Sequence, residues 1–145
     1  MIALLQRVLQ AGVHVDGAEV ASIGPGLLVF VGVRPNDTAD DAKKLLGRML
    51  RYRIFADEDG KMNLNLQQID GDLLLVPQFT LAADTRSGLR PGFSSAAPPD
   101  LGRRLFEAML LTARAQHARV ESGLFGAHMR VSLINDGPVT FWLES

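Results

Sequence analysis

The hydrophobic residues near the start of this chain fall into blocks that predict three strands. The runs 2–9, 12–22 and 27–33 are apolar or alternate apolar with polar residues, a pattern typical of strands. Asp16-Gly17 is a hairpin signal, and Gly24-Pro25-Gly26 marks a second turn. We therefore expect the chain to begin as a meander of strands.

Two longer stretches repeat apolar residues at helical spacing. The first follows the cap residues Asn36-Asp37-Thr38 and extends to about Tyr52, and the second covers 100–117. The apolar positions are Ala42, Leu45, Leu46, Met49 and Leu50 in the first, and Leu101, Leu105, Ala108, Met109 and Thr112 in the second. In the first stretch acidic residues come early and basic residues late, which suits the helix dipole and needs no functional explanation.

The rest of the pattern predicts further strands and one long loop. Strands are expected at 72–76, 128–135 and 139–143. The segment 86–99 is rich in Gly, Ser and Pro without periodicity, so it is either a substrate-binding loop or a plain connection. Together these elements predict an α+β or α/β fold, which we take as α+β, with antiparallel or mixed sheets and two long helices.

Length and composition narrow the class of protein. The chain has 145 residues, of which 47% are hydrophobic and 21% charged, values that predict one soluble domain covering 1–145. No apolar run is long enough to span a membrane, and segment 1–8 lacks the features of a secretory signal, so we expect a cytoplasmic protein. With no cysteine, disulfides and thiolate chemistry are excluded.

The net charge of −1 gives no overall attraction to nucleic acid, so an RNA partner needs a local basic patch. Three arginine clusters are candidates: Arg48 with Arg51 and Arg53, Arg86 with Arg90, and Arg103 with Arg104. By pattern alone, each cluster is more typical of a solvated face than of a phosphate site.

The residues best suited to chemistry lie where two predicted strands end. Gln78-Phe79-Thr80 follows an apolar run and can direct backbone N–H groups and the Thr80 hydroxyl at one point, as an oxyanion hole requires. In the structural alternative, Phe79 fills the core and Thr80 opens a strand. Gly137-Pro138 lies between two strand-like runs and predicts a tight turn or a cis peptide bond.

The signatures of several common enzyme classes are absent. The three histidines have no metal-binding spacing, and no serine-hydrolase elbow, P-loop or dinucleotide fingerprint occurs. Thr80 has no histidine or lysine nearby in sequence that could serve as its base, so it is a poor nucleophile on this pattern.

Taken together, the segments 78–85 and 135–142 resemble the two signature motifs of bacterial D-aminoacyl-tRNA deacylases. Their sequences are Gln78-Phe79-Thr80-Leu81-Ala82-Ala83-Asp84-Thr85 and Asn135-Asp136-Gly137-Pro138-Val139-Thr140-Phe141-Trp142. Segments 3–8, 52–55, 60–64, and Arg90-Pro91 with Phe93-Ser94 fit the same family. The resemblance covers essentially the whole chain and favours the functional interpretation of both motifs.

The resemblance implies a cytoplasmic homodimer that proofreads charged tRNA. Its reaction is hydrolysis of the ester between a D-amino acid and tRNA, or of glycine mischarged on the tRNA for alanine, and it implies neither a metal nor another cofactor. Gln78, Phe79 and Thr80 then surround the ester carbonyl, and the terminal 2′-hydroxyl of the tRNA assists the attacking water.

The same resemblance assigns chiral selectivity to Gly137 and Pro138. Their peptide bond is cis in the family and reaches into the site of the partner subunit, where its carbonyls exclude an L side chain and let glycine pass. Arg7 matches a family position that supports this loop.

Two departures from the family pattern leave alternatives open. Pro77 stands where relatives usually have serine, so a hydroxyl and an N–H are lost, and Gly92 stands where many relatives have a polar residue. We expect activity to survive because Gln78 and Thr80 are present. The alternatives are a non-catalytic RNA- or DNA-binding dimer and a hydrolase with Thr80 as nucleophile.

Overall fold

A six-stranded mixed sheet forms the body of the computed structural model, which describes residues 1–145. Its strands are β1 (Ile2–Val15), β2 (Ala18–Ile23), β3 (Gly26–Gly32), β6 (Asp72–Pro77), β7 (Val120–Ser122) and β8 (Arg130–Glu144). They are ordered β2-β1-β3-β6-β7, with β8 paired to β1. β1 is antiparallel to β2, β3 and β8, whereas β6 is parallel to β3 and β7. The expected α+β fold with a mixed sheet and two long helices is confirmed.

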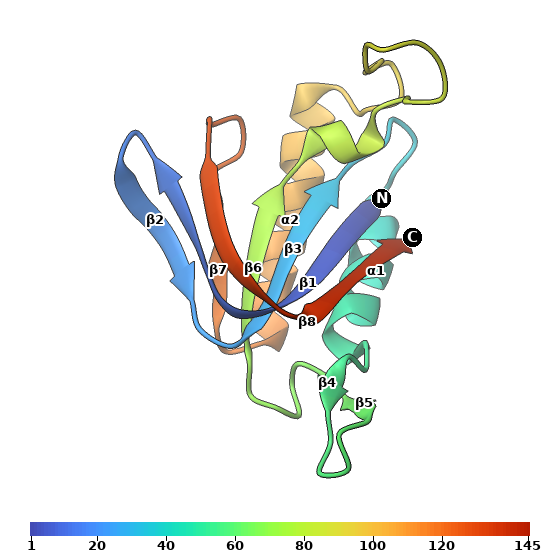
Figure 1. Cartoon of the computed structure of the whole chain (residues 1–145). Coiled ribbons are helices and arrows are strands. Elements are labelled where there is room, and N and C mark those ends of the chain that lie inside the picture. Colours follow the sequence, from blue (N-terminus) through green and yellow to red (C-terminus); the bar gives the residue numbers. More distant parts are fainter.

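The two helices, α1 (Ala39–Arg51) and α2 (Pro99–Gln116), pack on one face of this sheet (Figure 1). Thr38 caps α1 and forms a reciprocal capping box with Asp41, which satisfies N–H groups at the start of the helix. All five predicted apolar positions of α1 are buried. In α2, the predicted Leu101, Ala108 and Thr112 are only half-buried, because Phe106 and Ala113 share the buried stripe. Neither helix is long and apolar enough to cross a membrane.

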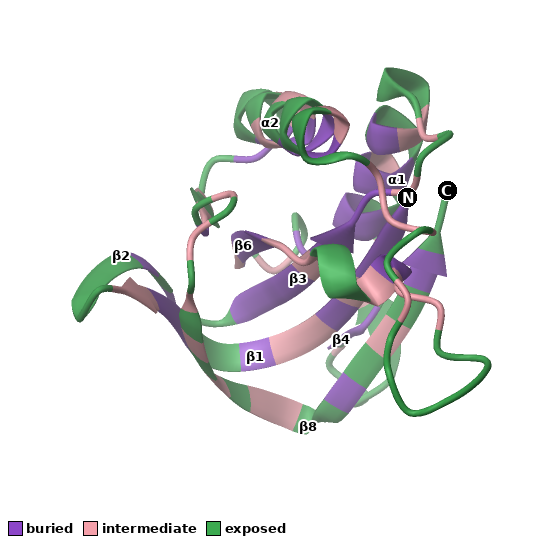
Figure 2. Cartoon of the chain, turned by 90° about the horizontal axis from the view of Figure 1, so that it is seen from above, coloured by how far each residue is buried: buried purple, intermediate pink, exposed green.

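Hydrophobic residues pack on both faces of the sheet. The larger cluster lies between the sheet and the helices, and a smaller one fills the concave side where β1, β2 and β8 curve over β3 and β6. Seen from above, β3 and much of β1 are buried, whereas β8 is half-buried or exposed along most of its length (Figure 2). Only Val139 and Leu143 of β8 are buried. The chain therefore presents a long edge strand to its surroundings.

Two predicted strand boundaries are wrong. The break expected between 2–9 and 12–22 does not exist, because β1 continues to Val15 and the chain reverses at Asp16-Gly17, both with positive φ. That reversal confirms the predicted hairpin. The strands expected at 128–135 and 139–143 are one strand, β8, which contains Gly137-Pro138. The two strands hold each other extended: β8 pairs with β1 across the expected break after residue 9, and β1 pairs with β8 on both sides of Gly137-Pro138.

Four short elements were not predicted. They are β4 (Phe55–Ala56), β5 (Met62–Leu64), β7 and the 3₁₀-helix η1 (Phe79–Ala82). β4 and β5 form a separate hairpin, and β7 extends the main sheet beside β6. Elements of two to four residues have too few positions to show a period, so the sequence pattern could not reveal them.

Candidate functional site

The first motif forms one tight helical turn at the end of β6. The N–H of Gln78 still belongs to the sheet, because it donates to the Val31 carbonyl at 2.8 Å. The chain then turns through η1, with 3.2–3.3 Å hydrogen bonds from Leu81 to Gln78 and from Ala83 to Thr80. Since the first N–H groups of a helix have no partner within it, those of Phe79 and Thr80 are free. The N–H groups of Phe79 and Thr80 are thus available to a ligand, whereas that of Gln78 is not.

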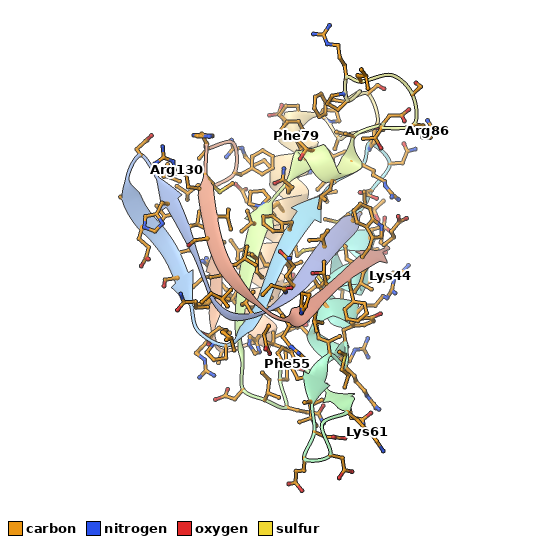
Figure 3. The ribbon with its side chains drawn as sticks, in the orientation of Figure 1. Lys44, Phe55, Lys61, Phe79, Arg86 and Arg130 are labelled. Carbon is orange, nitrogen blue, oxygen red and sulfur yellow. The ribbon has the colours of Figure 1, made fainter.

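The side chains of this motif are presented at the surface. Gln78 donates its amide Nε2–H to the Thr80 hydroxyl at 2.5 Å, so the hydroxyl hydrogen can point to a ligand. Phe79 is 59% exposed (Figure 3), and its ring centre lies 5.2 Å from that of Phe93. The structural alternative, in which Phe79 fills the core and Thr80 opens a strand, is therefore wrong. All three residues directly follow the end of β6, where Figure 3 labels Phe79.

An apolar cavity of about 470 Å³ opens beside Gln78 and Phe79. Its walls come from the ends of β3 and β6, the start of α2 and the segment 125–131. Phe125 contributes an aromatic wall and packs against α2 at Gly102, where a Cβ would lie 3.3 Å from its ring. An apolar cavity with a few polar groups at its rim is the usual form of a small-molecule site.

A second, more polar cavity of about 1010 Å³ lies on the Thr80 side of η1. It is bordered by the loop after η1, in which Asp84 and Gly92 exchange two backbone hydrogen bonds of 2.7 and 3.0 Å. Two side-chain hydrogen bonds from Arg86 and one from its backbone N–H lower the pKa of Asp84 well below its usual range. The predicted loop is therefore closed at its base and borders the site.

The second motif is a bulge in the middle of β8. In the β1–β8 ladder Gln6 pairs with Thr140 and Val8 pairs with Asn135, so β8 contains three more residues than β1 between these pairs. Within this bulge the Gly137-Pro138 peptide bond is cis, and both residues are exposed. Of the tight turn and the cis peptide bond expected here, the cis bond is present, and the motif is a projection from a continuous strand.

Arg7 and Asn135 hold the two sides of the bulge. Arg7 Nε lies 3.1 Å from the Asp136 carbonyl and 3.0 Å from its carboxylate, and Arg7 Nη1 donates to the Ile54 carbonyl at 2.7 Å. Asn135 Nδ2 donates to the Arg7 and Val139 carbonyls, each at 2.9 Å. The polar groups at the base of the bulge are therefore paired with one another.

We expect Asn135→Asp to loosen the bulge. The substitution keeps the shape of the side chain but replaces two N–H donors with a carboxylate oxygen facing two carbonyls. The lost pairing lowers the free energy of unfolding by about 2 kcal/mol. Chemical denaturation measures this change, and Asn65→Asp is the control for introducing the charge, because Asn65 is also half-buried but its side-chain oxygen accepts the Gln68 N–H, a bond that a carboxylate keeps. Equal stability of Asn135→Asp and the parent chain would show that the two Asn135 hydrogen bonds do not hold the bulge.

The two motifs are far apart within one chain. Gln78 is bonded to Val31 of β3, whereas Arg7, which holds the bulge, pairs with Leu27 of the same strand. Four residues of extended chain separate these points by about 13 Å. Figure 1 shows the same separation, with η1 at the upper end of β6 and the middle of β8 at its lowest point. A single chain therefore does not bring Thr80 and Gly137 together.

Pro77 fits the sheet without an unpaired group. It is the last residue of β6, and the neighbouring N–H of Gln78 faces β3. Because successive N–H groups of a strand face opposite sides, the Pro77 nitrogen faces β7, which ends at Ser122. The last bond on that side is donated by the Gly123 N–H to the Leu75 carbonyl, and proline is tolerated at the last residue of a strand, where the ladder stops.

Sequence reasoning placed the two motifs but missed residues that surround them. Phe125, His128 and Met129 line the apolar cavity, and Asn135 clamps the bulge. Asn135 was inside a recognised motif, where its amide next to Gly-Pro was the available signal. Phe125 and Met129 gave no signal, because apolar residues in a loop look the same whether they line a cavity or fill a core.

Two solved structures share this fold over nearly the whole length of the chain. The structure titled "c-Myc DNA Unwinding Element Binding Protein" is 34% identical to this chain and superimposes on it with a TM-score of 0.96. The match covers 100% of this chain and 99% of the other. "Structural Analysis of a probable eukaryotic D-amino acid tRNA deacylase" gives a TM-score of 0.86 over 99% of this chain and 98% of the other, at 19% identity, which supports the fold alone.

Sequence comparison gives the family. A family model described as D-Tyr-tRNA(Tyr) deacylase matches residues 4–144. The "D-aminoacyl-tRNA deacylase" of Azotobacter vinelandii is 62% identical over the full length of both chains. The chain belongs to the D-aminoacyl-tRNA deacylase family, as its two motifs indicated.

Proposed function

We propose that this chain is a hydrolase that cleaves the ester bond between a D-amino acid and the 3′-terminal ribose of tRNA. The observation that carries the proposal is the pair of free N–H groups of Phe79 and Thr80 beside an apolar cavity. An ester carbonyl placed at these donors gains negative charge on its oxygen during hydrolysis. Each such donor is worth roughly 3 kcal/mol in the transition state.

Water is the proposed nucleophile. Its oxygen attacks the ester carbon, the bond to the ribose oxygen breaks, and that oxygen takes up a proton, which releases the free amino acid and tRNA. The hydrogen-bond partner of Thr80 is an amide nitrogen, which cannot accept a proton, so Thr80 is positioned to donate and not to attack. As the family resemblance implies, the terminal 2′-hydroxyl of the tRNA assists the water.

The apolar cavity is the proposed site of the terminal adenine. It adjoins Gln78 and Phe79 and offers the Phe125 ring as a surface on which a base can stack. With the base there, the ribose and its ester lie near η1. The adjacent polar cavity beside Thr80 then receives the amino acid.

The complete site is proposed to form in a homodimer, with Gly137-Pro138 of one chain beside Thr80 of the other. The two motifs are too distant to meet within one chain, and exposed apolar side chains surround both. Leu9 and Ile134 lie near the bulge and are about half exposed, as is Trp142 farther along β8. A long exposed edge strand is ordinarily covered by a partner. Analytical ultracentrifugation tests this point, and a monomer that retains full activity would exclude the shared site.

Chiral selectivity is proposed to come from the rigid Gly137-Pro138 backbone. The Gly137 and Pro138 carbonyls, in a bulge held on its two sides by Arg7 and Asn135, exclude an L side chain by a steric clash that does not depend on side-chain identity. Glycine has no side chain, so glycyl-tRNA, including glycine mischarged on the tRNA for alanine, is also a substrate. We expect the enzyme to work in the cytoplasm, where tRNA is charged.

The deciding experiment uses tRNA charged with the D or L form of one amino acid, and with glycine, and follows loss of the ester. We expect rapid release of the D and glycyl forms and sparing of the L form. Equal loss of the D and L forms keeps a hydrolase but removes the proposed filter. Loss of none of them contradicts the hydrolase.

The non-catalytic alternative is favoured by one specific observation. The structure with a TM-score of 0.96 is titled as a DNA-binding protein, so this scaffold has a nucleic-acid-binding relative. Tight tRNA binding without turnover would support the alternative for this chain. A hydrolase with Thr80 as nucleophile is distinguished by trapping an acyl-enzyme adduct on Thr80, which the water mechanism does not form.

Pro77→Ser tests whether the departure from the family pattern matters. The proline nitrogen faces the end of the β6–β7 ladder at Gly123, so a serine N–H there adds at most one hydrogen bond at the margin of the sheet. We expect the rate of ester hydrolysis to change less than threefold and the free energy of unfolding by less than about 1 kcal/mol. A large gain in turnover would instead show that the missing hydroxyl limits this enzyme.

A further inference from the structure

The three arginine clusters of the sequence differ in how far their charges are already paired. Arg86 forms two side-chain hydrogen bonds with Asp84, and Arg48 and Arg51 donate to the Glu144 and Gly47 carbonyls. Arg103 has only a 4.0 Å contact with Glu107, one helical turn away, and both side chains are more than half exposed. Such an exposed pair contributes little, so Arg103 keeps most of its hydrogen-bonding capacity.

Arg103 is also held in place at the apolar cavity. Its guanidinium lies 4.9 Å from the centre of the Phe125 ring, in a cation–π arrangement. A Cβ on Gly126 would lie 3.6 Å from Arg103 Nη2, so the guanidinium also lies close to the 125–126 backbone. Phe125, Gly126 and the neighbouring Gly102 all line the cavity. The arginine therefore lies at the rim, with its aromatic partner forming the wall.

We propose that Arg103 binds the phosphodiester that precedes the terminal nucleotide of the tRNA. This inference rests on the proposed function, which places the terminal base in the cavity. A base stacked inside leaves its 5′ phosphate at the rim, where a planar guanidinium with free N–H groups matches phosphate oxygens. Stacking on Phe125 holds the guanidinium in position before the RNA arrives. Arg103 thus supplies a local positive charge at the cavity rim in a chain whose net charge is −1.

The test compares Arg103→Gln with Arg114→Gln on two substrates. Arg114 lies in the last turn of the same helix, about 16 Å away, so its substitution removes the same charge at a distance. The substrates are D-aminoacyl-tRNA and a 3′-D-aminoacyl-adenosine that has no phosphate. For Arg103→Gln we expect KM for the tRNA to rise roughly tenfold, with kcat and hydrolysis of the adenosine ester unchanged. Arg114→Gln should match the parent chain on both.

Binding of an uncharged hairpin that ends in the tRNA 3′ sequence gives a readout independent of hydrolysis. The slope of log affinity against log salt should fall by about 0.7 in Arg103→Gln, the change expected for one lost phosphate contact to a single strand. If the parent chain binds the hairpin and Arg103→Gln does not, but neither hydrolyses any ester, the proposed function fails and the phosphate contact stands.

Two results would overturn the inference. If hydrolysis of D-aminoacyl-tRNA by Arg103→Gln equals that of the parent chain, Arg103 does not bind the substrate, although the proposed function is intact. If Arg103→Gln loses activity equally on the tRNA and on the adenosine ester, Arg103 acts by supporting Phe125 and not by binding phosphate.

Discussion

Replacement of Gly137 by alanine is expected to lower hydrolysis of D-aminoacyl-tRNA by about 100-fold, because displacement of a site by 1 Å has effects of this size. Gly137 has a φ of +135°, which L residues rarely adopt. A Cβ there would lie 2.6 Å from Val139 Cγ2 and 2.9 Å from the Val139 nitrogen. Val139 is buried, so the bulge must move to make room. We also expect the preference for D over L substrates to shrink.

Gly60→Ala is the matched control for this substitution. Gly60 also has a positive φ, +77°, but nothing lies within 4 Å of its added Cβ, and it belongs to the β4–β5 hairpin. It reproduces the backbone strain, worth about 1–3 kcal/mol, without the clash at the site. Steady-state kinetics on D and L substrates and thermal unfolding measure both variants. If both lose activity equally, backbone strain and not the Gly-Pro projection explains the loss.

Replacement of Arg7 by alanine is expected to produce the second largest effect. The side chain is 14% exposed and contacts the Asp136 backbone, the Asp136 carboxylate and the Ile54 carbonyl, so its loss frees the base of the bulge. Loss of charge-assisted hydrogen bonds should lower the free energy of unfolding by about 2–3 kcal/mol. We expect the ratio of D to L hydrolysis to fall about tenfold, because the carbonyls that exclude L side chains are no longer fixed.

Arg7→Lys and Arg53→Ala separate charge from geometry in this experiment. Lysine keeps the charge but lacks the planar fork that reaches two carbonyls, so we expect it to recover only part of the selectivity. Arg53→Ala removes an exposed arginine next to Ile54 and should leave the D to L ratio unchanged. Full selectivity in Arg7→Ala would contradict the role of Arg7 in holding the Gly-Pro bulge.

The elements with several periods of apolar residues could be predicted from the sequence, and the short ones could not. α1 was predicted to within a few residues because five apolar positions and a capping residue agree. The division of β8 into two strands was wrong because Gly-Pro ordinarily ends a strand. Here the ladder with β1 resumes after three extra residues, and only the partner strand carries that information.

The two motifs of the candidate site could be located, but not how they are arranged. The sequence pattern showed that Gln78, Phe79 and Thr80 follow a strand. It did not show the tight turn that frees two N–H groups, because this turn begins where the Val31 carbonyl accepts the hydrogen bond from Gln78. Asn135 bonds to Arg7, which is far away in the sequence, and Arg103 on α2 stacks on Phe125 in the following loop. Such contacts depend on the folded chain, which a single sequence does not describe.

The distance between the two motifs in one chain has a genetic consequence under the shared-site proposal. Consider a cell that produces two alleles, one altered at Gly137 and the other at Thr80. Their mixed dimer contains one site with both defects and one site with neither, so two inactive products complement each other. With both changes in one allele and a normal second allele, each site of the mixed dimer carries one defect. The double allele therefore inactivates every mixed dimer and leaves only homodimers of the normal chain active, whereas each single change leaves one intact site in every mixed dimer.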